Sequence, residues 1–212
     1  MNEKNEYALA DRAIQLLKKK AIRRFEDAKS KAAGVKFDEL NVLGICQALY
    51  AALESDNFKT FLELAIMKYL ATEPHGDDEP DDEWLMEYLE FYDPVTKYVY
   101  ANEVERKRDR LAEAVNASTE KVKEFTKGLG YWVQMTAHYA DDVSDTATIK
   151  AFKDAGITKV MWHTVTDNRV CEDCEERDGK VYNINKIPPK PHWGCRCYLT
   201  AVRSNKDKFR SN

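Results

Sequence analysis

The C-terminal part of the fold is decided by residues 171–197, CEDCEERDGKVYNINKIPPKPHWGCRC, which hold four of the five cysteines. Two cysteines separated by two residues reach one metal ion from a tight turn, and Cys-x-Cys on a strand directs both thiols to the same face. Zinc takes four ligands, so the sequence allows either the four cysteines or three cysteines with the histidine. We therefore expect a structural zinc site with five candidate ligands: Cys171, Cys174, His192, Cys195 and Cys197.

Two other interpretations of the cysteines are four reduced thiols packed as small hydrophobic side chains, or two disulfides. The chain begins with MNEKNEYALADRA, which lacks the apolar stretch of a signal peptide, and this favours a reducing compartment where clustered cysteines bind metal. A module of roughly 55 residues buries little apolar surface, so zinc worth roughly 10–16 kcal/mol would decide whether it folds. A closed set of protein ligands leaves no place for an activated water, which favours a structural role.

Period-two patterning surrounds the cysteines. In residues 157–165, Val160 and Trp162 share one face while Met161 and His163 share the other, as is typical of a strand. Asp178-Gly179 indicates a hairpin leading into a second strand at residues 181–184, and residues 195–202 are expected to close the sheet. The sequence thus predicts a β-rich, zinc-stapled module over residues 156–202, followed by a basic flexible tail over residues 203–212.

Residues 1–155 carry the period of helices. Apolar residues recur every three or four positions from Tyr7 to Ala28, and Gly34 is a suitable end. The predicted fold class is α+β, with a mainly helical N-terminal body and a small β-rich C-terminal module. Residues 73–83 have seven acidic residues out of eleven and are expected to form a solvated loop. Further helical segments are expected at 37–53, 58–70, 84–92 and 103–115, with one opening near Ser118 and one at 145–155.

The two parts of the chain also differ in net charge. Residues 151–212 carry 12 basic and 8 acidic side chains, whereas residues 1–150 carry 21 basic and 29 acidic ones. The overall net charge of -4 excludes a uniformly basic nucleic-acid coat protein. No apolar run approaches the roughly 18 residues that a bilayer span needs, so we expect no membrane partner.

Known catalytic motifs are missing from the sequence. A zinc deaminase needs His-x-Glu and a zincin needs His-Glu-x-x-His, and neither occurs; nor does a phosphate-binding glycine-rich loop. We expect no catalytic residue and no cofactor-binding residue other than the metal ligands. A metal-dependent nuclease, with His163 or His192 as base beside Asp167, is the less favoured alternative.

Several motifs together resemble a known family. Residues 162–164, residues 167–174, Asp178-Gly179 and the ending His192-Trp-Gly-Cys195-Arg-Cys197 resemble the C-terminal domain of phage head-morphogenesis proteins, the Mu F-like minor capsid proteins. Residues 92–110 resemble the segment that precedes that domain, so the resemblance covers roughly residues 90–202. His-Trp-Gly-Cys stands where His-Pro-x-Cys is more usual, which leaves the ligand spacing intact.

The resemblance implies a non-enzymatic virion protein that acts in head assembly, genome packaging or DNA delivery. It implies a location in the head interior or at the portal, and in the host cytoplasm during assembly. The implied partners are the portal protein, a scaffold or major capsid protein, and viral DNA. A zinc-dependent nucleic-acid-binding module is the alternative that the residues allow. The basic side chains that would lie near DNA are Arg169, Lys180, Lys186, Lys190 and Arg196.

Overall fold

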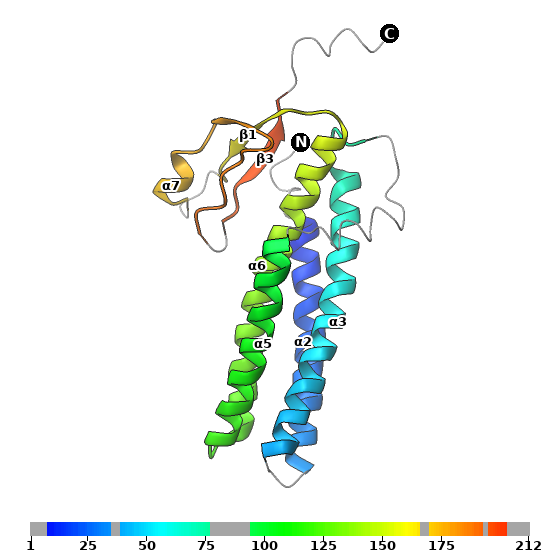
Figure 1. Ribbon diagram of the computed structural model, residues 1–212, viewed down its shortest axis with the longest axis vertical. Helices are drawn as coiled ribbons and strands as arrows, with labels where there is room; N and C mark the ends of the chain where they lie inside the picture. The colour runs from blue at the N-terminus through cyan, green and yellow to red at the C-terminus, as the bar shows by residue number, and fades with distance from the viewer. Residues whose placement is uncertain (1–7, 35–38, 77–93, 166–169, 193–194, 203–212) are drawn as a thin grey trace. The chain divides into compact units, whose positions relative to one another are not determined.

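The computed structural model describes residues 8–34, 39–76, 94–165, 170–192 and 195–202. It confirms the predicted α+β class: a mainly helical chain with a small antiparallel sheet in its C-terminal part (Figure 1). The elements in chain order are α2 (Ala8–Gly34), α3 (Glu39–Ala71), α5 (Pro94–Ala117), α6 (Lys121–Asp154), β1 (Lys159–His163), α7 (Glu172–Glu175), β2 (Val181–Asn183) and β3 (Tyr198–Ala201).

Contacts divide the chain into two units. The helical unit comprises Asp11–Glu63 and Asp82–Ala140, and the C-terminal unit comprises Met1–Ala10, Leu64–Asp81 and Asp141–Asn212. The last turns of α3 and α6 are therefore grouped with the strands. The expected division into a helical body over residues 1–155, a β-rich module over residues 156–202 and a tail over residues 203–212 stays a prediction.

The core of the helical unit is formed by side chains from α2, α3, α5 and α6, which run side by side in Figure 1. Phe25 of α2, Val115 of α5 and Trp132 of α6 are at most 1% exposed. Tyr50 of α3 meets Trp132 edge-on, with ring centroids 5.3 Å apart. The spacing predicted for the first helix is confirmed, because it places Ala10, Leu17, Ala21, Phe25 and Ala28 in the buried interior.

Helix α3 is continuous, whereas the sequence pattern predicted two helices at 37–53 and 58–70. The pattern breaks at polar residues 54–57, but Asn57 is only 1% exposed. Its amide nitrogen donates hydrogen bonds to the hydroxyls of Tyr100 (3.0 Å) and Thr136 (3.3 Å). A buried polar side chain with its hydrogen bonds satisfied therefore continues the interior face that the apolar pattern seemed to interrupt. The predicted segment 84–92 and residues 77–83 of the acidic loop lie outside the described residues.

Helix α6 is also longer than predicted, since it joins the two segments expected near Ser118 and at 145–155. It includes Gly128, at which an added Cβ would lie 3.1 Å from Leu111 Cδ1 and 3.2 Å from Phe25 Cε1. Gly128 thus allows close packing of α6 against its neighbours within a continuous helix. Helix α5 begins at Pro94, where a proline at the first helical position costs no backbone hydrogen bond.

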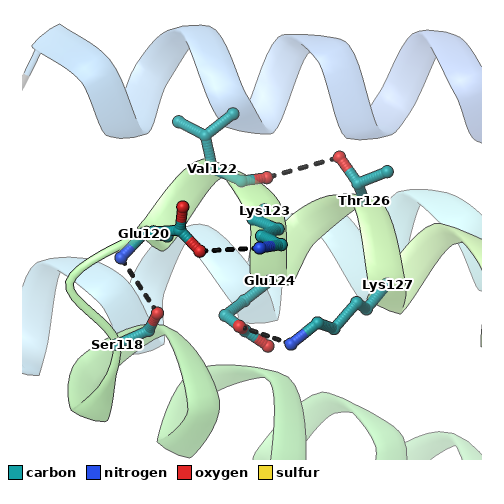
Figure 2. Close-up of polar contacts among 7 residues, drawn as sticks. All are labelled: Ser118, Glu120, Val122, Lys123, Glu124, Thr126 and Lys127. Carbon is teal, nitrogen blue, oxygen red and sulfur yellow. Dashed lines mark hydrogen bonds and ion pairs between the residues drawn. The ribbon is translucent and has the colours of Figure 1, made fainter.

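The start of α6 is fixed by local polar contacts, which Figure 2 shows. The backbone N–H of Glu120 donates to Ser118 Oγ at 3.0 Å, which satisfies a donor ahead of the first turn. Lys123 pairs with Glu120 and Lys127 with Glu124, each at 2.8 Å. The partners of each pair are three residues apart, a spacing at which opposite charges support a helix. The predicted helix start near Ser118 is confirmed.

The three strands of the C-terminal unit form an antiparallel sheet in the order β2-β1-β3. In its register, Val160 faces Tyr182 of β2, and Trp162 faces Leu199 of β3. Val160 and Trp162 are buried while Met161 and His163 are half-buried, which confirms the predicted period of two. Each strand is shorter than the segment predicted for it.

The connections of this unit rely on two glycines with positive φ. Gly156 (φ 73°) ends α6, and the backbone N–H of Ile157 donates to the carbonyl of Phe152 at 2.8 Å. This is the bonding pattern of a helix that closes on a left-handed glycine. Gly179 (φ 70°) occupies the turn before β2, and its N–H donates to the carbonyl of Trp162 at 2.8 Å.

Candidate metal centre

The candidate ligands are positioned by two short segments on either side of β2. Cys171 is the residue before α7, and its carbonyl accepts the Glu175 N–H at 3.0 Å. That single helical turn brings Cys174 back towards Cys171, and Cys174 is buried. Cys195 and Cys197 directly precede β3, and both are buried.

The structure brings all five candidate ligands together in two groups of three. Cys171, Cys174 and His192 form one group, and Cys174, Cys195 and Cys197 form the other. Within each group the ligand atoms lie within 4.8 Å of one another. Cys174 belongs to both groups: its sulfur is 3.4 Å from His192 Nε2 and 3.6 Å from Cys195 Sγ. These side chains could hold a metal ion.

The cysteines are free thiols rather than disulfides. A distance of 3.6 Å between the sulfurs of Cys174 and Cys195 far exceeds the roughly 2.05 Å of a disulfide bond. Soft thiolate and imidazole donors in this number suit ions such as zinc and copper(I), or an iron–sulfur cluster, and not magnesium or calcium. The donor set therefore fits the class of metal that the spacing predicted.

In each pair, hydrogen bonds from the second cysteine lower the thiol pKa of the first. The pKa of Cys171 is lowered, first because the backbone amide of Cys174 donates a hydrogen bond to its sulfur, although burial opposes this. The pKa of Cys195 is lowered to about 5, first by a hydrogen bond from the Cys197 thiol, with the Cys197 backbone amide adding to the effect. Both thiolates are favoured by donors built into their own turns.

The second cysteine of each pair behaves in the opposite way. Burial raises the pKa of Cys174 to about 12. The pKa of Cys197 is also raised, first because its thiol proton is shared with Cys195 and then by burial. Several thiolates this close repel one another, so they coexist only when a cation compensates their charge. A metal that binds here must displace these protons.

Trp162 supplies a further donor directed at the cysteines. Its indole nitrogen is buried and has no hydrogen-bond partner of ordinary geometry within the described part of the chain. The indole N–H nevertheless lowers the pKa of Cys197, against the larger effects of Cys195 and burial. A metal-bound thiolate would give this N–H the acceptor that it lacks, as outer donors commonly do around metal ligands.

Comparison with known proteins finds one family that matches part of the chain. Residues 105–200 match the phage Mu protein F like family. The Mu F-like segment makes up just under half of the chain, and it contains all five candidate ligands. The match supports the resemblance to phage head-morphogenesis proteins. No curated protein and no solved structure matches the chain. None of the described helices has the length and apolar character that crossing a bilayer requires.

Lys190, in the Mu F-like segment, is placed differently from an exposed DNA-contacting lysine. Its ammonium is buried and lies 2.6 Å from Asp145 Oδ2 on α6. Burial by itself would lower the pKa of Lys190, but the charge and hydrogen bond of Asp145 outweigh it and raise that pKa. The same ammonium helps to lower the pKa of Cys195. Lys190 therefore links the cysteine cluster to α6.

The other basic candidates in the Mu F-like segment differ in exposure. Lys180 and Lys186 are exposed, Arg196 is half-buried, and Arg169 lies outside the described residues. Contact with DNA through these side chains stays a prediction.

His163, the alternative catalytic base, contacts two residues of the neighbouring strand β3. Its Nε2 lies 2.8 Å from Thr200 Oγ1, and its ring stacks on Tyr198 with centroids 5.1 Å apart. Asp167, the acid proposed beside it, lies outside the described residues. Sequence reasoning missed the roles of Trp162 and Lys190; strand alternation places Trp162 on the sheet face opposite His163, but no sequence signal pairs Lys190 with Asp145.

Proposed function

We propose that the chain is a non-enzymatic minor head protein of a phage, carried in the virion near the portal protein and acting in head assembly, genome packaging or DNA delivery. The match of residues 105–200 to the Mu F-like family is the observation that carries this proposal. All five candidate ligands lie within the matched segment, so the proposed metal module belongs to the part of the chain that carries the family match.

In this proposal the ion is zinc and its role is structural. Two sulfurs bound to one tetrahedral zinc at about 2.3 Å lie about 3.8 Å apart. The 3.6 Å between the sulfurs of Cys174 and Cys195 supports zinc. Zinc would join the α7 turn to the segment before β3. Four protein ligands leave no position for a reacting water.

The four cysteines are the preferred ligand set. Cys174, Cys195 and Cys197 are buried and form one group, which leaves the fourth position to Cys171 or His192. Cys171 accepts the backbone amide of Cys174 in the same way that Cys195 accepts that of Cys197. His192 is exposed, and in this arrangement it donates to the thiolates of the α7 turn from outside.

Metal content tests the zinc site. We expect about one zinc per chain in protein purified under reducing conditions, as measured by elemental analysis. Cys195→Ser should lose the zinc, whereas Cys46→Ser should retain it because Cys46 is buried in the helical core and away from the cluster. His192→Asn should also retain zinc. Zinc-free native protein, or zinc that persists in Cys195→Ser, would contradict the proposed site.

Co-purification tests the functional assignment. The full chain, co-expressed with the portal protein of the same phage, should elute with the portal oligomer in size-exclusion chromatography. Two results would overturn the assignment. Metal-dependent DNA cleavage that is lost in His163→Ala would favour the nuclease, and salt-dependent DNA binding without portal association would favour the nucleic-acid-binding module.

A further inference from the structure

A cavity of 430 Å³ opens in the helical unit where α3, α5 and α6 meet. Its lining includes buried Tyr50 and Leu111, and exposed Arg110, Lys127 and Tyr131. All of these residues belong to the helical unit, so the cavity is separate from the candidate metal centre. Apolar walls with a few polar groups are the usual composition of a ligand-binding pocket.

The exposed part of this cavity is positively charged. Lys107 pairs with Glu103 at 3.2 Å and lies 5.4 Å from the ring centre of Tyr131. Lys127 pairs with Glu124 at 2.8 Å, and Figure 2 shows this pair on the opposite side of α6 from Val122. Arg110 forms no ion pair with any residue that the structure describes. Three basic side chains thus line the cavity with one carboxylate, that of Glu124.

The lining itself favours an acidic protein segment. Three cations beside one carboxylate attract an anionic ligand. The apolar walls formed by Tyr50 and Leu111 accept an apolar side chain, which a peptide carries and a phosphate backbone does not. Tyrosine and arginine are also the side chains most enriched at the energetic centres of protein interfaces.

We propose that this cavity binds an acidic segment of a partner protein, with one bulky apolar side chain inserted beside Tyr131 and Leu111. Carboxylates of that segment pair with Arg110 and Lys127. The inference goes beyond the proposed function, because it identifies a protein-binding surface in the helical unit and does not depend on zinc.

The test uses a fluorescein-labelled peptide with four glutamates and one tryptophan, titrated with the full-length protein and followed by fluorescence anisotropy. We expect saturable binding that weakens about tenfold or more in Arg110→Glu, since an attraction becomes a repulsion. Arg106→Glu is the matched control: Arg106 is exposed on the same helix, does not line the cavity and pairs with Glu103. It should change the affinity less than about twofold.

Further arms separate this proposal from general charge attraction. Peptides with glutamine in place of glutamate, or alanine in place of tryptophan, should each bind about tenfold more weakly. A peptide with lysine in place of glutamate should bind Arg110→Glu more tightly than the native protein. Equal weakening by Arg110→Glu and Arg106→Glu, or displacement of the peptide by duplex DNA, would overturn the proposal. Circular dichroism of both variants confirms that they are folded.

Discussion

The buried ammonium of Lys190 lies between the candidate metal ligands and α6. Removing it should lower the free energy of unfolding. Lys190→Met leaves Asp145 without this partner, and we expect the free energy of unfolding to fall by about 1–2 kcal/mol. The expected loss lies below the roughly 3–5 kcal/mol of a fully buried pair because the Asp145 side chain is 33% exposed. Urea unfolding followed by tryptophan fluorescence measures the effect.

Lys186→Met is the control for this experiment, since Lys186 is exposed in the same connection. It should change the free energy of unfolding by less than about 0.5 kcal/mol. Similar losses for the two variants would show that the Asp145 pair contributes no more than an exposed lysine.

The candidate ligands could be predicted from sequence because their spacing is local. Cys-x-x-Cys and Cys-x-Cys each carry their own geometry, whatever the rest of the chain does. The pairing of Lys190 with Asp145 could not be predicted, because it depends on how a proline-rich connection packs against a helix 45 positions earlier. A lysine among prolines has the same sequence signature whether its ammonium is buried or solvated.

At the scale of elements, α6 contains one glycine with open space around it and one glycine that is closely packed. An added Cβ at Gly130 meets nothing within 4 Å, so Gly130→Ala should raise the free energy of unfolding by about 0.5–1 kcal/mol through helix propensity. At Gly128 the same methyl presses on Phe25 and Leu111, which are 0% and 5% exposed. Gly128→Ala should therefore cost about 1 kcal/mol despite its better propensity.

Thermal unfolding of the two variants side by side measures the difference. If Gly128→Ala were as stabilising as Gly130→Ala, the close approach of α6 to its neighbours would be looser than the distances indicate.

Helix type was easier to predict than helix length. The apolar spacing of α2 gave its interior face correctly, but α3 and α6 were each divided where the spacing broke. In α3 the break is Asn57, whose buried amide is satisfied by Tyr100 and Thr136 on two other helices. Periodicity treats every polar residue as exposed, so it cannot anticipate a hydrogen bond made only after the helices have packed.

For the whole molecule, metal removal should affect the two units differently. The core cluster of the helical unit contains none of the five candidate ligands, whereas Cys174, Cys195 and Cys197 form a cluster with Trp162 in the C-terminal unit. A strong chelator should therefore change the near-ultraviolet signal of Trp162 while most of the helical ellipticity at 222 nm remains. Circular dichroism in both regions checks this.

Returning zinc should restore the near-ultraviolet signal in the native protein and in Cys46→Ser. Simultaneous loss of both signals on chelation would mean that the units unfold as one, and unchanged spectra would mean that no metal supports the C-terminal unit.

The sharing of Cys174 between both donor groups also bears on how an ion would enter the site. The first group runs from exposed His192 through half-buried Cys171 to Cys174, and the second is buried throughout. An ion arriving from solvent would meet the accessible imidazole and thiol first, and could then exchange the imidazole for the deeper sulfurs while Cys171 and Cys174 stay bound. Loading would thus proceed stepwise without the ion being released, and loss of Cys174 alone would interrupt both stages.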